Sequence, residues 1–167
     1  MFCRSVMSAE SRAYVLDTID SGWVSSVGSY VDRFESLVAE ICGVGSAVAA
    51  VNGTAALHIA LLLGGVRPGD EVLTPSLTFI ATANAIVAAG AVPVFCEVDG
   101  SLGLDPQSLG AVIGERTAAV MPVHLENVVC DMDGVLAVAR RRGVPVIEDA
   151  CQAMGASYHG VAAGALG

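Results

Sequence analysis

Short apolar runs alternate with helix-forming segments along most of this chain, and this alternation limits the fold more than any other feature of the sequence. The apolar runs predict five strands, at 46–51, 71–74, 92–98, 117–124 and 144–147. The segments between them predict four helices, at 54–63, at 77–89, after the pair Asp105 and Pro106, and at 131–142. Continuous apolar strands that alternate with helices indicate an α/β fold, in which a mainly parallel sheet is covered by helices.

Two stretches without any charge, 41–66 and 72–96, are long enough to span a membrane. Glycine and asparagine interrupt both, and proline the second, so each divides into a short strand and a helix, and we expect no membrane span. Of the 167 residues, 54% are hydrophobic and only 15% are charged, which is apolar for a free-standing domain. The length therefore predicts one domain, or part of a larger one, whose surface partly meets other protein.

The charge balance, with 17 acidic residues against 8 basic ones, argues against nucleic acid as a partner. The five cysteines are widely spaced and form no Cys-x-x-Cys motif. We therefore expect buried free thiols, with no disulfide framework and no metal site. Residues 1–11 show no signal-peptide pattern, so we expect a cytoplasmic protein.

In a parallel α/β sheet, ligands bind beyond the carboxyl ends of the strands. Three segments of this chain are expected at that edge: 52–54, 74–79 and 148–152. Gly53 and Thr54 stand where a strand is expected to become a helix, which suits a phosphate group, although a helix cap at Thr54 explains them about as well. Phe79 either covers the face of a planar cofactor or lies in the core.

Two acids, Glu148 and Asp149, follow the apolar strand expected at 144–147. A carboxylate at the bottom of a site raises the pKa of a nearby heterocyclic nitrogen, and a pyridoxal phosphate ring needs such a partner to act as an electron sink. Asp149 is the candidate for this role. Glu148 should point the opposite way, into a salt bridge or a helix cap. A phosphate site, a ring cover and a partner for a pyridinium nitrogen together indicate pyridoxal phosphate.

Six blocks of sequence cover nearly the whole chain: NGTAALHIAL, GDEVLTPSLTFIATANAI, GAVPVFCEVD, RTAAVMPVHL, CDMDGVLAVA and VIEDACQAMGASYHG. In their order and spacing they resemble the DegT/StrS family of pyridoxal-phosphate sugar aminotransferases. The block SGWVSSVGSYVDRFE, at 21–35, is similar to one branch of that family. This branch aminates nucleotide-linked keto-sugars on the way to legionaminic-acid-type nonulosonic sugars.

The resemblance implies that residues 1–167 form an incomplete large domain of a fold type I, aspartate aminotransferase-like enzyme. Residues 1–35 would form a segment for substrate and dimer contacts, and the C-terminal small domain would be absent. The resemblance assigns six residues to the cofactor: Gly53, Thr54 and Ala55 to its phosphate, Phe79 to the face of its ring, Asp149 to the ring nitrogen and Gln152 to the ring hydroxyl. It places Trp23 and Ser26 near the sugar nucleotide. His124, which follows a strand, belongs either to this edge or to the supporting structure.

The sequence departs from the family in two places. Residues 126–129 replace an aromatic residue and a glycine-containing turn that are common there, so the shape of this loop is open. All eight basic residues are arginine, and the chain contains no lysine. In this family a lysine holds the cofactor as a Schiff base and moves protons between cofactor and substrate. We therefore expect no covalent attachment of the cofactor to a side chain of this chain.

By resemblance, the function is a pyridoxal-phosphate-dependent transfer of an amino group from glutamate to a nucleotide-linked keto-sugar, carried out by a homodimer. Without the lysine, the chain is expected to be inactive alone. One alternative is a non-catalytic remnant that binds a phosphorylated ligand or a full-length homologue. A nicotinamide-binding domain is disfavoured, because no Gly-x-Gly-x-x-Gly motif follows the first expected strand.

Overall fold

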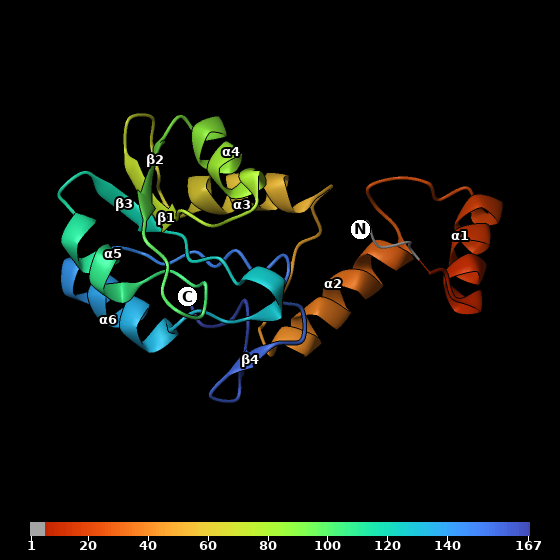
Figure 1. Ribbon diagram of the computed structural model, residues 1–167. Coiled ribbons are helices and arrows are strands. Elements are labelled where there is room, and N and C mark those ends of the chain that lie inside the picture. Colours follow the sequence, from red (N-terminus) through yellow and green to blue (C-terminus); the bar gives the residue numbers. More distant parts are fainter. Residues whose placement is uncertain (1–5) are drawn as a thin grey trace.

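A computed structural model describes residues 6–167 and shows a parallel three-stranded sheet between two layers of helices (Figure 1). Its strands are β1 (Glu71–Pro75), β2 (Val92–Cys96) and β3 (Thr117–Val120), and β1 lies in the middle. Beyond β3, Val146 forms a parallel bridge with Val120, and Asp149 forms one with Val123. The predicted α/β fold with a mainly parallel sheet is therefore confirmed.

Helices cover both faces of this sheet (Figure 1). On one face lie α3 (Gly53–Leu63) and α4 (Ile80–Ala88), and on the other lie α5 (Pro106–Val112) and α6 (Met132–Arg142). The central strand β1 joins the two halves of the core, because neighbouring side chains of a strand point to opposite faces. Val72 packs in the cluster of α3 and α4, and Leu73 packs in the cluster of α5 and α6.

Side-chain caps mark the starts of α3, α5 and α6. Asp105 caps α5 with Pro106 at the first helical position, as the sequence predicts. Asp131, the first residue of the helix predicted at 131–142, is the cap of α6. The alternative of a helix cap at Thr54 is wrong. Asn52 is the cap of α3, because its side-chain oxygen accepts the N–H of Ala55 at 2.9 Å.

The strand predicted at 46–51 is absent from the structure, and this prediction is wrong. The segment is irregular, and Val48 and Val51 are 87% and 90% exposed. Among residues 6–167 no strand pairs with it, and an apolar run forms a strand only where another strand offers its hydrogen bonds. The run at 144–147 forms only one bridge, at Val146. A hairpin that was not predicted follows it, formed by β4 (Ser157–Tyr158) and β5 (Val161–Ala162).

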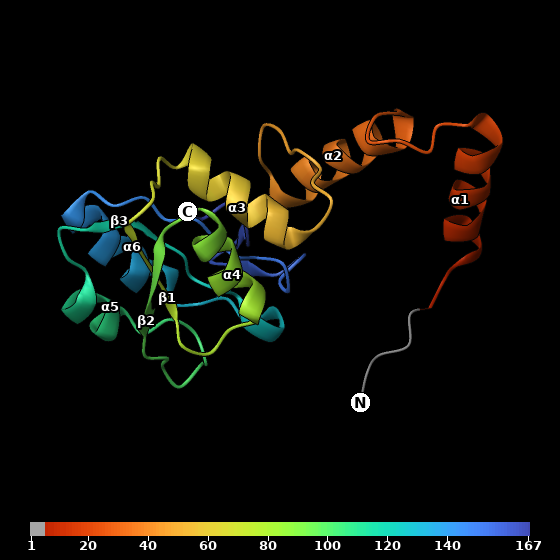
Figure 2. The ribbon, with the colours of Figure 1, turned by 90° about the horizontal axis from the view of Figure 1, so that it is seen from above.

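The first two helices, α1 (Ala9–Ser21) and α2 (Ser29–Cys42), form an arm that extends from the sheet and its helices (Figure 2). Neither helix has a buried residue. The two helices contact each other through the rings of Tyr14 and Tyr30, whose centroids lie 5.4 Å apart, and the Tyr30 hydroxyl donates to Asp17 at 2.9 Å. Of the segment expected at 1–35, the first five residues lie outside the described part. No helix within residues 6–167 has the length and apolar character needed to cross a membrane.

Candidate functional site

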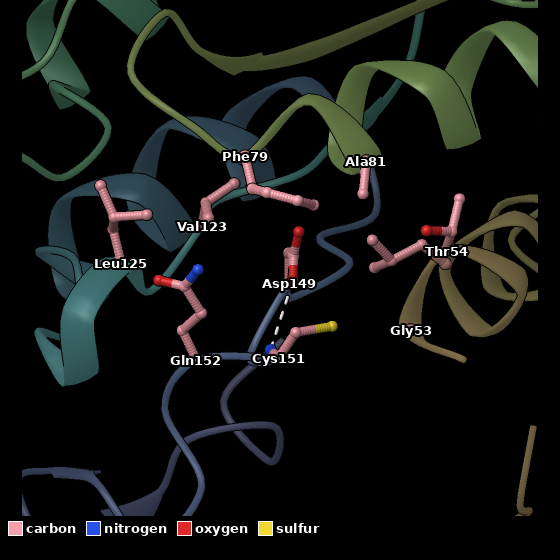
Figure 3. A pocket seen from close by; sticks show the side chains of 10 residues that line it. Gly53, Thr54, Phe79, Ala81, Val123, Leu125, Asp149, Cys151 and Gln152 are labelled. Atoms are coloured by element: carbon pink, nitrogen blue, oxygen red, sulfur yellow. Dashed lines mark hydrogen bonds between the residues drawn. The ribbon is translucent and has the colours of Figure 1, made fainter. Parts of the chain in front are cut away.

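A cavity of about 260 Å³ lies at the carboxyl ends of the strands, between the start of α3, the start of α4 and the segment after 148 (Figure 3). Five of the six residues assigned to the cofactor line this cavity: Gly53, Thr54, Phe79, Asp149 and Gln152. They come from three segments that are distant in sequence. The fold therefore brings together the three edge segments that the sequence singled out.

Asp149 is a nearly buried residue of the cavity, and both of its carboxylate oxygens accept hydrogen bonds. It is 6% exposed, and its Oδ2 accepts the hydroxyl of Thr82 at 2.7 Å while its Oδ1 accepts the N–H of Cys151 at 3.3 Å. The hydroxyl of Thr78 lies 2.8 Å from that of Thr82 and extends the network. Because the surroundings are mostly apolar, a cation that enters the cavity interacts strongly with this carboxylate.

The start of α3 forms the wall opposite Gln152 (Figure 3). Gly53 and Thr54 are the first residues of this helix, where backbone N–H groups have no acceptor inside the helix and the helix dipole favours an anion. A Cβ atom on Gly53 would lie 2.6 Å from Sγ of Cys151, so only glycine fits there without a shift. Ala55 does not line the cavity, and Asn52 already accepts its N–H.

Phe79 lies outside the core. It precedes α4, and its residue surface is 62% exposed. Figure 3 shows its ring directed into the cavity above Asp149. Of the two possibilities open from the sequence, the structure excludes a core phenylalanine and leaves an aromatic ring available to a planar ligand.

Gln152 connects the cavity to the loop in which the sequence departs from the family. Its side-chain Oε1 accepts the N–H of Glu126 at 3.1 Å, and its backbone oxygen accepts the N–H of Asn127 at 3.0 Å. These two loop residues lie in the 3-10 turn η1 (Leu125–Asn127) with φ of 50° and 65°, a conformation that asparagine tolerates better than most residues. The Oε1 bond directs the Gln152 side chain and leaves its NH₂ group as the donor for a ligand.

Trp23 and Ser26 do not line the cavity. They lie between α1 and α2 in the arm, and Trp23 borders a separate hollow between those two helices. Their assignment to a sugar nucleotide stays a prediction.

Thr82 and Cys151 contribute to the site, but the sequence had assigned neither of them a role in it. Thr82 lies one helical turn after Phe79, a spacing that could have placed both on the same side of α4. The expectation that all the thiols are buried is wrong for Cys151, which is exposed. Cys96 and Cys130 are buried and Cys42 is half-buried, while Cys3 lies outside the described residues. Partial burial of the thiol and the neighbouring Asp149 raise the pKa of Cys151 to about 11, so it stays a neutral thiol at pH 7.

His124 and Glu148 form a buried pair behind the cavity. His124 Nε2 lies 2.9 Å from Glu148 Oε2. The Cys130 N–H donates to Nδ1 at 3.3 Å, which requires Nδ1 to carry no proton. This geometry decides the assignment: the ring proton is on Nε2 and is donated to Glu148. Both residues therefore support the structure. The sequence predicted this for Glu148 and left it as one of two possibilities for His124.

Comparisons with known proteins identify relatives along almost the whole chain. The model of the DegT/DnrJ/EryC1/StrS aminotransferase family matches residues 5–167. The chain is 49% identical to GDP-perosamine synthase of Caulobacter vibrioides over 162 residues, which are 96% of this chain and 44% of that protein. It is 46% identical to the spore coat polysaccharide biosynthesis protein SpsC of Bacillus subtilis over 163 residues, 97% of this chain and 42% of SpsC.

Solved structures agree with these relatives. The chain superposes on 3-amino-5-hydroxybenzoic acid synthase with a TM-score of 0.92 and 34% identity, covering 99% of this chain and 44% of that one. It superposes on NtdA from Bacillus subtilis, solved with bound cofactor PMP, with a TM-score of 0.83 and 32% identity, covering 92% of this chain and 36% of NtdA. The chain thus spans less than half of the length of each of these relatives. Because the family model matches nearly every residue, this chain belongs to the DegT/DnrJ/EryC1/StrS aminotransferase family.

Proposed function

We propose that this chain supplies the cofactor-binding part of a pyridoxal-phosphate-dependent sugar aminotransferase. The observation that supports this most strongly is the nearly buried carboxylate of Asp149, held by Thr82 in a cavity that also presents the Phe79 ring. A charged group in apolar surroundings calls for a cationic partner, and a protonated pyridine nitrogen is such a partner. Relatives that include a structure with bound PMP support the same cofactor.

The residues present fit the cofactor from three sides. Asp149 would pair with the ring nitrogen and keep it protonated, and Thr82 would hold the carboxylate in place. Gly53 and Thr54 would bind the phosphate at the start of α3. When bound, pyridoxal phosphate supplies an electron sink for amino transfer.

The remaining two positions would complete the binding of the ring. Phe79 would cover one face and exclude water from it, since its ring is directed into the cavity. Gln152 would donate its NH₂ group to the ring oxygen, because its Oε1 is already bonded to the N–H of Glu126. The assigned role of Ala55 in phosphate binding would require Asn52 to release its N–H.

We propose the substrates by analogy with the relatives. Glutamate would give the amino group, and a nucleotide-linked keto-sugar would receive it. Two relatives are named GDP-perosamine synthase, from Caulobacter vibrioides and Vibrio cholerae, and they favour a GDP-linked sugar. The legionaminic-acid branch suggested by residues 21–35, and the homodimer, stay predictions.

Cofactor binding and covalent attachment can be tested separately. Because the chain has no lysine, we expect it to bind pyridoxamine 5′-phosphate reversibly and to show no amino transfer alone. After incubation with pyridoxal phosphate and reduction with borohydride, mass spectrometry of peptides should find no cofactor on any side chain. The N-terminal amine, which can react on its own, is scored separately. A reduced adduct on a side chain within 6–167, or no binding of pyridoxamine 5′-phosphate at all, would contradict the proposal.

The alternative is a non-catalytic chain that pairs with a full-length homologue, and one observation favours it. Apolar side chains of the arm are exposed, including Phe34, Leu37 and Ile41 of α2. Co-expression with a complete homologue would test this alternative. Recovery of the two chains in a fixed ratio would support it, and recovery of the homologue alone would exclude it.

A further inference from the structure

The pair of His124 and Glu148 is buried, and the proposed function does not use it. The side chains of His124 and Glu148 are 0% and 4% exposed. Besides His124, the Glu148 carboxylate accepts three backbone N–H groups: those of Gly164 at 2.8 Å, Leu166 at 2.6 Å and Gly167 at 2.7 Å. One buried carboxylate therefore holds the segment 164–167 against the strand-like run at 146–149.

The same histidine also holds Asp149. Its ring donates to Glu148, while its backbone N–H donates to the carbonyl oxygen of Asp149 at 3.0 Å. The Asp149 N–H donates to the oxygen of Pro122 at 2.9 Å, which closes the bridge between the two segments. The two neighbouring acids thus share one support, although their side chains have different partners.

The segment 164–167 packs closely against this support. A Cβ atom on Gly167 would lie 3.0 Å from the oxygen of Val146 and 3.4 Å from Glu148, and one on Gly164 would lie 3.8 Å from Cβ of Ala150. Movement of 164–167 away from the sheet would break the hydrogen bonds that the Glu148 carboxylate accepts from the three backbone N–H groups, and it would remove packing contacts from Ala150.

We propose that His124 and Glu148 are positioning residues that clamp segment 164–167 to the sheet and thereby fix the direction of the Asp149 carboxylate in the cavity. The proposal rests on the proposed function, because it assigns this clamp to the residue that pairs with the cofactor. Neither residue lines the cavity, so their effect on a ligand passes through Asp149.

Four variants test the clamp. Glu148→Gln replaces one acceptor oxygen by an NH₂ group that faces backbone donors, and His124→Leu removes the donor to Glu148. His124→Gln keeps an amide donor that can reach Glu148, so it should recover part of the function. Asp133→Asn is the control, because it removes one exposed acid from α6. Circular dichroism checks that each variant is folded, and His124→Gln keeps the test decisive if the other two variants do not fold.

Two measurements on the full chain separate clamping from positioning. Amide hydrogen exchange of Gly164 and Leu166 should accelerate about tenfold or more in Glu148→Gln and His124→Leu. The reason is that each variant loses hydrogen bonds that involve the charged Glu148 carboxylate. Binding of pyridoxamine 5′-phosphate should weaken several-fold in the same two variants. His124→Gln should lie between them and the original chain, and Asp133→Asn should match the original chain.

Unchanged amide exchange in Glu148→Gln overturns the clamp. Faster exchange with unchanged affinity for pyridoxamine 5′-phosphate overturns the positioning role, although the proposed function survives if Asp149→Asn loses binding. If the original chain does not bind this probe, the proposed function fails, and the ¹³Cγ chemical shift of Asp149 then decides the inference. A shift that moves in Glu148→Gln supports positioning, and a shift that stays overturns it.

Discussion

Asp149 keeps one orientation because both of its carboxylate oxygens accept a hydrogen bond and only 6% of its surface is exposed. The sequence indicated Asp149 through its place after an apolar strand, but it gave no sign of which hydroxyl would hold the side chain. Thr82, 67 residues earlier in the chain, approaches it only because α4 and the bridge at 149 meet at one edge of the sheet. Contacts of this kind depend on the fold and not on local pattern.

Replacing Thr82 by valine removes the donor to Asp149 and keeps the shape of the side chain. We expect the affinity for pyridoxamine 5′-phosphate to fall by about tenfold, since a hydrogen bond to a charged group is typically worth 1.5–3 kcal/mol. Thr78→Val is the matched control, because Thr78 contacts the hydroxyl of Thr82 and makes no direct bond to Asp149. Equal affinities of Thr82→Val and the original chain, measured by fluorescence titration, would show that Thr82 does not hold the carboxylate.

Gly53→Ala tests the close contact between α3 and the segment after Asp149. The added Cβ would lie 2.6 Å from Sγ of Cys151, so we expect a loss of about 1–3 kcal/mol in the free energy of unfolding, as is usual for overpacking. Cys151→Ala removes that sulfur, so the double variant should regain most of the loss. A urea titration of the single and double variants measures this coupling, and additive effects would mean that the two residues do not clash.

At the scale of elements, the four helices predicted from the sequence are all present, whereas one of the five predicted strands is absent. The cap at Asp105 is local, since its side chain accepts N–H groups two and three residues later, and its position was predicted directly. The run at 46–51 has a composition similar to that of true strands but forms none, because pairing depends on a partner elsewhere. The conformation of the loop at 126–127 could not be predicted from local sequence. Its positive φ angles occur together with hydrogen bonds to Gln152, which is 26 positions from Glu126.

The clamp at Glu148 links the stability of these elements to pH. Burial alone would raise the pKa of Glu148, but His124 and the N–H groups of Gly164, Gly167 and Leu166 lower it below the ordinary value of 4.5. A lowered pKa contributes stability that is present above pH 4.5 and is lost as the pH falls through the lowered value.

We therefore expect the free energy of unfolding of the original chain to fall on acidification below pH 4.5 more steeply than that of Glu148→Gln. Urea titrations between pH 7 and pH 3 would measure this difference, with Asp133→Asn as the control for the removal of one acid. Parallel curves for the original chain and Glu148→Gln would show that the carboxylate does not stabilise the folded state.

At the scale of the whole molecule, alternation of apolar runs and helices was enough to predict a parallel sheet covered on both faces. It was also enough to predict which edge holds the cavity, because all parallel strands end on the same side. It did not predict the arm of α1 and α2, whose residues are all at least partly exposed and whose apolar side chains Phe34 and Ile41 remain uncovered. The relatives are more than twice as long, so their chains contain regions with no counterpart here.

The most direct test of the central claim, that Asp149 pairs with a protonated ring nitrogen, is the ¹⁵N chemical shift of pyridoxamine 5′-phosphate labelled at that nitrogen. It is measured bound to the original chain and to Asp149→Asn, at a pH above the pKa of the free ring. We predict the shift of a protonated nitrogen in the original chain and that of an unprotonated nitrogen in any complex with Asp149→Asn. An unprotonated nitrogen in the complex with the original chain would contradict the claim.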